Sequence, residues 1–246
     1  MIPLRDANPT RRTPWVTLAI IAINVAVFIF WQGFPIGGVD PNNEMQIKSL
    51  VCYGVIPNEV TNMRPLPEVA RFCGGDKSVL VSIFTSMFLH GSLLHIAGNM
   101  LFFWVFGNNI EDRMGRIVFP IFYLAAGVIA VFAQVFPSPG SQVPLIGASG
   151  AIAGTLGAYL VLYPGARVLA LVPIFFFLQV MQLPAVVVLG FWFVLQAISS
   201  FTSFGGAAEQ GGVAYLAHVG GFAFGALVAL LFYRGRQQPR PSYLEY

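Results

Sequence analysis

Few polar side chains lie within the long apolar stretches of this sequence, and two of them could act together as a nucleophile and its base. The polar residues within these stretches are Asn24, His95, Asn99, Gln134, Ser149, Gln196 and His218. Polar groups are costly inside a bilayer, so each of them is a candidate functional residue. A serine alone is a weak nucleophile and needs an adjacent base, which His218 could supply to Ser149.

Three of these residues are predicted to lie at one depth in the membrane. His95 and His218 each precede the charged end of their apolar stretch by 16 residues, and Ser149 precedes the Pro-Gly end of its own by 15. At about 1.5 Å per residue, all three lie roughly 22–24 Å from one face of an apolar core about 30 Å thick. No Asp or Glu lies at this depth, which favours a Ser–His dyad over a triad.

The residues around Ser149 could stabilise an oxyanion. Ser149 lies in the motif Gly-Ala-Ser-Gly, at the expected N-terminus of a helix, where unpaired N–H groups and the helix dipole favour negative charge. His95 and Asn99 are four residues apart and share one helix face. We assign both side chains, together with Gly147 and Gly150 beside the serine, to a candidate oxyanion site.

Small residues could bring the serine and the histidine together. One set follows Ser149 and another surrounds His218, where two glycines form a GxxxG motif that allows close helix approach. The two sets are Gly150, Gly154 and Gly157, and Ala217, Gly221 and Gly225. Glycines of this kind also pack helices that have no catalytic role.

Simpler explanations exist for each residue. A lone intramembrane serine usually caps or packs a helix, and a lone buried histidine packs more often than it catalyses. A metal site is disfavoured because His90 and His95 lie about 140° apart around a helix, and the sequence has no HExxH motif or Cys/His cluster. We therefore predict no metal. The nucleophile elbow of soluble hydrolases needs a glycine where this sequence has Ala151.

The composition indicates a polytopic membrane protein. Of 246 residues, 57% are hydrophobic and 9% are charged, against about a quarter charged in soluble domains. Four apolar stretches of roughly 20 residues are clear candidates to span a bilayer: 14–34, 92–110, 117–136 and 213–233. Two further spans are expected at 149–163 and 184–200. We expect an all-α fold, a bundle of six transmembrane helices with a long outer loop between helices 1 and 2.

The arginines predict the orientation. One set of helix ends carries Arg5, Arg11, Arg12, Arg113, Arg116, Arg167, Arg234, Arg236 and Arg240. The positive-inside rule places these ends, and both termini, in the cytoplasm of a multi-pass cell-membrane protein. The expected parts are a cytoplasmic segment (1–13), the first span (14–34), an outer loop with an interfacial segment (35–91), a catalytic core of five spans (92–233) and a cytoplasmic tail (234–246). Because the arginines follow topology, the net charge of +3 does not indicate a nucleic-acid partner.

Two segments are ambiguous. The outer loop contains Cys52 and Cys73, which could form a disulfide or remain as two free buried thiols. Residues 168–200 are mostly apolar, are interrupted by Pro173 and Pro184, and contain no polar loop. We interpret them as one span (184–200) preceded by an interfacial or re-entrant stretch.

Taken jointly, these motifs resemble those of rhomboid intramembrane serine proteases, over nearly the whole chain. They are the serine motif at 147–150, the sequence Ala-His-Val-Gly-Gly-Phe at 217–222 with Gly225, and His90 with the sequence His-Ile-Ala-Gly-Asn at 95–99.

The resemblance implies that Ser149 is the nucleophile, His218 the base, and His95, Asn99 and the Ser149 amide the oxyanion site. It also implies no cofactor, single-span membrane proteins as substrates, a cavity opening outward beneath loop 201–212, and lateral access between spans 2 and 5. It leaves the oligomeric state open. One departure is Ala153, where some members have a tyrosine that packs on the histidine, so Tyr215 or an apolar neighbour must orient His218 instead. The alternatives are an inactive client-binding protein or a small transporter.

Overall fold

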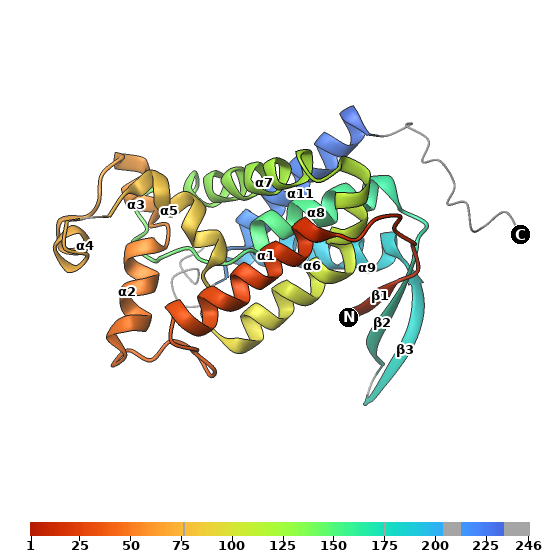
Figure 1. The fold of residues 1–246 in the computed structure, drawn as a ribbon, viewed down its shortest axis with the longest axis horizontal. Coiled ribbons are helices and arrows are strands. Elements are labelled where there is room, and N and C mark those ends of the chain that lie inside the picture. Colours follow the sequence, from red (N-terminus) through yellow and green to blue (C-terminus); the bar gives the residue numbers. More distant parts are fainter. Residues whose placement is uncertain (76, 175, 204–212, 234–246) are drawn as a thin grey trace, which may run out of the picture.

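Helices dominate the structure, as expected for a chain whose backbone polar groups must be satisfied inside a bilayer. The computed structural model describes residues 1–75, 77–174, 176–203 and 213–233. The long helices run side by side, with a group of short helices at one end and a small sheet at the other (Figure 1). The long helices are α1 (Trp15–Ala26), α6 (Leu93–Met114), α7 (Val118–Val135), α8 (Ser149–Leu162), α9 (Ala185–Ser203) and α11 (Tyr215–Phe232).

Two of the described helices, α7 and α11, are long and apolar enough to cross a membrane by themselves. A third span is possible if α6 is combined with Val79–Phe88, from which it is bent by 81°. Three shorter apolar helices cover Trp15–Trp31, Ser149–Leu162 and Ala185–Ser200. The structure is thus that of a mostly helical membrane protein, and the count of six spans stays a prediction.

The helix α8 lies at the centre of the bundle. Its residues from Gly150 to Tyr159 are all buried, which fits a helix that is apolar on every side. The helix α1 packs on α6 and begins at one of its carboxylates: Glu111 accepts hydrogen bonds from the backbone N–H groups of Val16 (3.0 Å) and Thr17 (2.7 Å). A negative side chain at a helix N-terminus satisfies donors that have no intrahelical partner.

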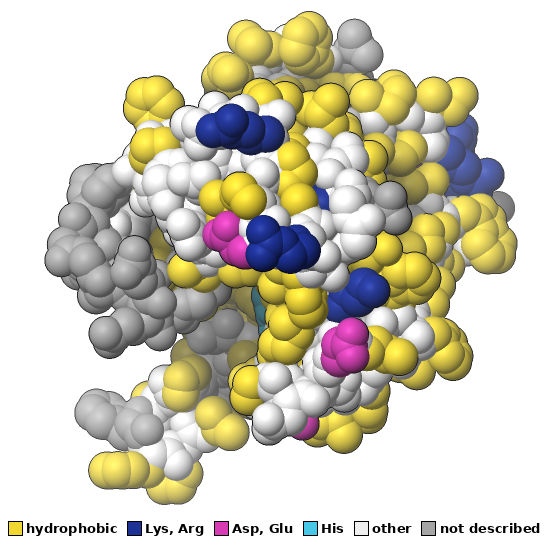
Figure 2. Space-filling model, turned by 90° about the vertical axis from the view of Figure 1, so that its left-hand side faces the viewer, with side chains coloured by type: hydrophobic (Ala, Val, Ile, Leu, Met, Phe, Trp, Pro, Cys, Tyr) yellow, Lys and Arg dark blue, Asp and Glu magenta, His cyan; other side chains and the backbone are white. Residues whose placement is uncertain are grey.

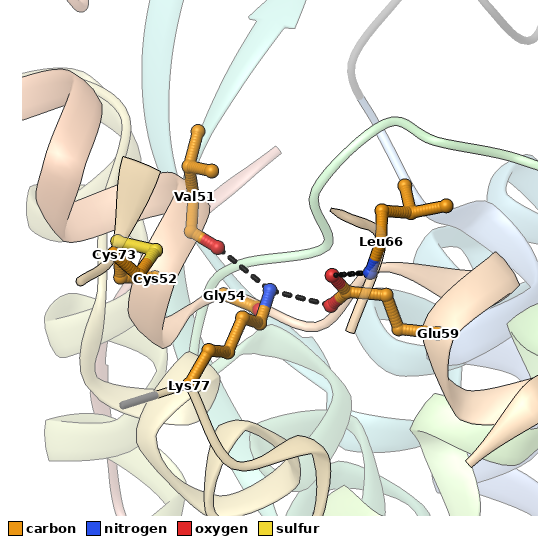
Figure 3. The surroundings of a disulfide bond; sticks show 7 residues. All are labelled: Val51, Cys52, Gly54, Glu59, Leu66, Cys73 and Lys77. Carbon is orange, nitrogen blue, oxygen red and sulfur yellow. Dashed lines mark hydrogen bonds and ion pairs between the residues drawn. A yellow bond between two sulfur atoms is a disulfide. The ribbon is translucent and has the colours of Figure 1, made fainter. Parts of the chain in front are cut away.

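The segment between α1 and α6 is folded. It contains α2 (Glu44–Tyr53), α3 (Pro57–Asn62), α4 (Pro67–Phe72) and α5 (Val79–Thr85). Of the two alternatives for its cysteines, the structure has the disulfide, which joins Cys52 on α2 to Cys73 just after α4 (Figure 3).

A buried ion pair lies beside the disulfide (Figure 3). Lys77 Nζ lies 2.6 Å from Glu59 Oε2, and both side chains are fully buried. Lys77 also donates to the carbonyl oxygens of Val51 (2.7 Å) and Gly54 (3.2 Å). The other oxygen of Glu59 accepts from the Leu66 N–H at 2.9 Å. Burial lowers the pKa of Lys77, and the hydrogen bond and charge of Glu59 oppose this shift.

The prediction of an all-α fold is wrong at the opposite end, where three strands form an antiparallel sheet (Figure 1). The strands are β1 (Ile2–Asp6), β2 (Arg167–Ile174) and β3 (Phe177–Pro184), in the order β1-β2-β3. The stretch expected to be interfacial or re-entrant is therefore a β-hairpin. Its backbone groups pair within the hairpin and with the N-terminal segment, so they need no helix to be satisfied.

The side chain of Asp6 links the sheet to the helix bundle through hydrogen bonds. Its Oδ2 accepts hydrogen bonds from the hydroxyl of Tyr159 on α8 (2.8 Å) and from Nδ2 of Asn109 on α6 (2.7 Å). Burial raises the pKa of Asp6, although these hydrogen bonds act in the opposite direction. The segment 1–13, expected only as a cytoplasmic end, thus includes a strand that contacts two long helices. The expected tail, 234–246, lies outside the described residues.

Candidate active site

Ser149 and His218 are in hydrogen-bonding contact. The distance between Ser149 Oγ and His218 Nε2 is 2.7 Å. Ser149 is the first residue of α8, and His218 lies in the first turn of α11. A hydroxyl at this distance from an imidazole nitrogen can transfer its proton to it.

The contact depends on how closely α8 and α11 approach. Gly221 and Gly225 on α11 face the carbonyl oxygens of Gly150 and Gly154 on α8, and a Cβ at either position would overlap the facing backbone. Gly157 meets the Phe222 carbonyl in the same way. Gly150 and Gly154 also lie against α7, where a Cβ would be 2.5 Å from the Cβ atoms of Ala130 and Ala126. The glycines that the sequence singled out therefore allow α8 to approach both α11 and α7.

Hydrogen-bond donors surround the serine. The first intrahelical hydrogen bond of α8 runs from the Ile152 N–H to the Ala148 carbonyl at 2.9 Å, so the amides of Ser149 and Gly150 have no intrahelical acceptor. Within the described part of the chain, the buried Asn99 Nδ2 has no hydrogen-bond partner. An unpaired buried donor beside a nucleophile is suited to an oxyanion.

Gly147 has no free N–H to donate to an oxyanion, but its lack of a side chain makes room for His95. Its N–H is already bonded to the Ser86 carbonyl at 2.9 Å. Its φ of +117° favours glycine, and a Cβ here would lie 2.8 Å from His95 Nε2. The imidazole of His95 therefore lies against the backbone just before Ser149.

A second layer of contacts holds His95. Its Nδ1 accepts from the Gly91 N–H at 3.4 Å, which leaves Nε2 to carry the ring proton in the neutral form. The buried ring of His90 packs edge-on against it, with centroids 5.0 Å apart. Gln32, which sequence reasoning overlooked, fixes the backbone of His90 through two hydrogen bonds, at 3.0 and 2.9 Å.

The far side of the His218 imidazole meets α9. Its Nδ1 lies 2.7 Å from Gln196 Oε1. The Trp192 ring centroid is 5.8 Å from that of His218, and the Tyr215 ring is nearly perpendicular to it at 6.5 Å.

The polar side chains of the candidate site line a cavity of about 540 Å³. His95, Asn99, Ser149, Gln196 and His218 all line it, among mostly apolar side chains. Figure 2, a view onto the end that carries the short helices, shows histidine atoms within a hollow. The structure thus brings five of the seven polar residues noted within the spans to one cavity. The other two lie elsewhere: Asn24 Nδ2 donates to the Ile20 carbonyl at 2.8 Å, and Gln134 Oε1 accepts from the Ala217 N–H at 3.3 Å.

A sequence model of the Rhomboid domain matches residues 77–235. The match covers more than half of the chain and includes every residue of the cavity. The chain belongs to the rhomboid family.

Individual rhomboid proteins are also similar to this chain. "Rhomboid protein 1, mitochondrial" of Saccharomyces cerevisiae is 28% identical over 169 residues, covering 67% of this chain and 45% of that protein. "Rhomboid protease GluP" of Bacillus subtilis is 33% identical over 147 residues, covering 60% and 24%. "Presenilin-associated rhomboid-like protein, mitochondrial" of Homo sapiens is 36% identical over 105 residues, covering 42% and 28%. The chain therefore spans less than half the length of these relatives.

In this rhomboid, Gln196 and Trp192 on α9 contact the imidazole of His218. Ala153 has no aromatic ring to pack on His218, and the expected candidate Tyr215 makes only an edge contact. The sequence marked Gln196 as a polar residue within a span but gave it no role, and it did not single out Trp192. Amphipathic spacing could have paired them, because residues four apart share a helix face.

Within the described ranges, no three His, Cys, Asp or Glu side chains are grouped so that they could hold a metal ion. The expected loop over the cavity, 201–212, lies largely outside those ranges, and its side chains are not described.

Proposed function

We propose that this rhomboid is an intramembrane serine endopeptidase in which Ser149 is the nucleophile and His218 the general base. The observation that carries the proposal is the 2.7 Å contact between Ser149 Oγ and His218 Nε2 at the wall of a cavity. The relative named "Rhomboid protease GluP" supports the same class of reaction.

The proposed reaction has two halves. As Ser149 Oγ attacks a peptide carbonyl carbon, its proton passes to His218 Nε2 and the carbonyl oxygen becomes an oxyanion. We assign Asn99 Nδ2, His95 Nε2 and the backbone amides of Ser149 and Gly150 as its hydrogen-bond donors, because Asn99 Nδ2 has no other partner among the described residues and both side chains line the same cavity as Ser149. The imidazolium then protonates the leaving amine, and a water molecule, deprotonated by His218, hydrolyses the acyl-enzyme.

The substrate and membrane placement are part of the same proposal. We infer single-span membrane proteins as substrates, because an apolar helix can enter the mainly apolar cavity from the bilayer. Six spans, formed by α1, α6, α7, α8, α9 and α11, would place the disulfide on the outer, oxidising side and both termini on the inner side. Two relatives are named mitochondrial and one is bacterial, so the comparisons fit a bacterial or a mitochondrial inner membrane.

The test uses purified protein in detergent, a single-span substrate and a fluorophosphonate probe that reacts with activated serines. We expect cleavage and labelling by the wild type, and loss of both in Ser149→Ala and His218→Ala. We expect Asn99→Ala to lower kcat by about 10²-fold, the cost of one lost oxyanion donor, with little change in thermal unfolding. Cleavage by Ser149→Ala at the wild-type rate would exclude the serine as nucleophile.

A further inference from the structure

Both ring nitrogens of His218 are engaged, by groups on different helices. Nε2 contacts Ser149 Oγ on α8 and Nδ1 contacts Gln196 Oε1 on α9, each at 2.7 Å. A base in a two-residue site would need only the first contact. The second contact therefore calls for a physical explanation.

The second contact decides which nitrogen can act as a base. A neutral imidazole carries one proton, and an amide oxygen can only accept a hydrogen bond. With Gln196 Oε1 against Nδ1, the proton must lie on Nδ1, and Nε2 keeps its lone pair toward the Ser149 hydroxyl. The opposite tautomer would set the Nδ1 lone pair against the Gln196 oxygen, and Ser149 Oγ would then accept from Nε2–H and have no base to receive its proton.

We propose that Gln196 is a positioning residue that fixes His218 in the Nδ1–H tautomer and orients its ring toward Ser149. The inference rests on the proposed protease function and assigns to a neutral amide the role that a carboxylate has in a Ser-His-Asp triad. Gln196 acts through His218 and makes no bond with the reacting atoms.

The helix α9 presents Gln196 together with a second contact to the same ring. Trp192 lies four residues earlier and so on the same helix face, with its ring tilted by 35° from the His218 imidazole. Trp192 is itself packed between Phe102 on α6 and Phe222 on α11, at centroid distances of 6.4 and 6.2 Å. The indole restricts the plane of the imidazole while the amide selects its tautomer.

Because these two groups come from α9, the dyad is complete only when α9 is in place. Ser149 and His218 belong to α8 and α11, which are joined by their glycine interface. Separating α9 from the bundle would leave that interface unchanged but would remove the acceptor at Nδ1.

Two substitutions separate this role from simple packing. Gln196→Met keeps the length of the side chain and removes the acceptor, whereas Gln196→Glu keeps an acceptor at the same reach. The matched control is Ser200→Ala, which removes the hydrogen bond from Ser200 Oγ to the Gln196 carbonyl (2.8 Å) one turn further along α9. It alters the same helix without touching the imidazole.

We expect Gln196→Met to lower kcat by 10- to 100-fold with KM within about twofold, below the roughly 10⁴-fold loss from a wrong tautomer in a serine protease triad. Gln196→Glu should recover most of that loss, and Ser200→Ala should remain within about twofold of the wild type. Equal kcat values for Gln196→Met and Ser200→Ala would overturn the proposal, as would a Gln196→Glu variant no better than Gln196→Met.

A measurement without substrate decides the tautomer directly. Nitrogen-15 spectra of histidine-labelled protein in detergent distinguish Nδ1–H from Nε2–H, with the His218 signals assigned by their loss in His218→Ala. We expect Nδ1–H in the wild type and a shift toward Nε2–H in Gln196→Met. An Nε2–H wild type would refute the role of Gln196 even if the enzyme cleaves. Conversely, if Ser149→Ala cleaves normally, the proposed function fails while the spectra still decide the tautomer.

Discussion

Replacement of Gly225 by alanine tests whether the glycine interface sets the geometry of the dyad. A Cβ at this position would overlap the carbonyl oxygen, carbonyl carbon and Cα of Gly154 on α8. These are backbone atoms, so no side-chain rotation can relieve the overlap. The two helices must therefore separate.

The size of the effect follows from the geometry. A carbon–oxygen contact needs about 3.3 Å, so α11 must move by roughly 1 Å or more at Gly225. His218 lies two turns away along the same helix, about 10 Å, and a rigid helix transmits much of this movement to it. A misplacement of about 1 Å can cost roughly 10²-fold in rate. Overpacking itself costs about 1–3 kcal/mol of stability.

The assay is cleavage of a single-span substrate in detergent, with thermal unfolding and fluorophosphonate labelling of Ser149 measured in parallel. We expect Gly225→Ala to lower kcat by 10- to 100-fold and to slow labelling by a similar factor. The matched control is Gly190→Ala on α9, where a Cβ would meet nothing within 4 Å. A Gly225→Ala enzyme as active and as stable as Gly190→Ala would refute the reasoning.

Three further predictions concern the two ends of the bundle. Because the disulfide joins residues 21 apart, replacing Cys52 and Cys73 by serine should destabilise the segment by about 3 kcal/mol, measured as faster proteolysis between them. Glu59→Gln leaves the charge of Lys77 buried without its partner and should cost about 3–5 kcal/mol, measured by thermal unfolding. Burial raises the pKa of Asp6 above the ordinary value of 3.8 for an aspartate side chain. The folded state then binds more protons than the unfolded state between these two values, so stability should fall as pH rises through them. Asp6→Asn should remove that dependence.

Each of these predictions has an outcome that contradicts it. An unchanged proteolysis rate after replacement of both cysteines would show that the segment of short helices is stable without the disulfide. In Glu59→Gln, burial still lowers the pKa of Lys77 in the folded protein. The unfolded state then binds more protons than the folded state, so this variant should regain stability as pH rises toward 10.5, the ordinary pKa of a lysine. A loss that is constant with pH would contradict this account. Equal slopes of stability against pH in wild type and Asp6→Asn would exclude Asp6 as the titrating group.

The position of His95, Ser149 and His218 near one end of three helices could be predicted from the sequence because it depends on local signals. Proline, glycine and charged residues mark where apolar stretches end, and the rise per residue of a helix is fixed. The structure places all three residues near the first turns of α6, α8 and α11. The close contact between helices could also be predicted from the glycines, since only the absence of a side chain permits such close approach of two backbones.

The β-sheet and the contacts around the histidines could not be predicted in this way. The hairpin β2–β3 is mostly apolar, and its two glutamines, Gln179 and Gln182, fall on opposite faces of β3, so it shows no polar–apolar alternation. Its partner β1 lies more than 160 residues away in the sequence. The rotation of α9, which turns Gln196 toward His218, is set by packing of Trp192 against two other helices. These features depend on contacts distant in the sequence, which residue spacing does not reveal.

A neutral acceptor beside His218 fits the position of this site inside an apolar bundle. A carboxylate at Nδ1 would stabilise the imidazolium more strongly, but a charge within the membrane is costly. An amide oxygen selects the same tautomer with no buried charge. Because an amide stabilises the imidazolium less, more of the stabilisation of the transition state must come from the oxyanion side. There, Asn99 presents a buried Nδ2 that has no partner among the described residues. On this reasoning, losing Asn99 should cost the enzyme at least as much as losing Gln196.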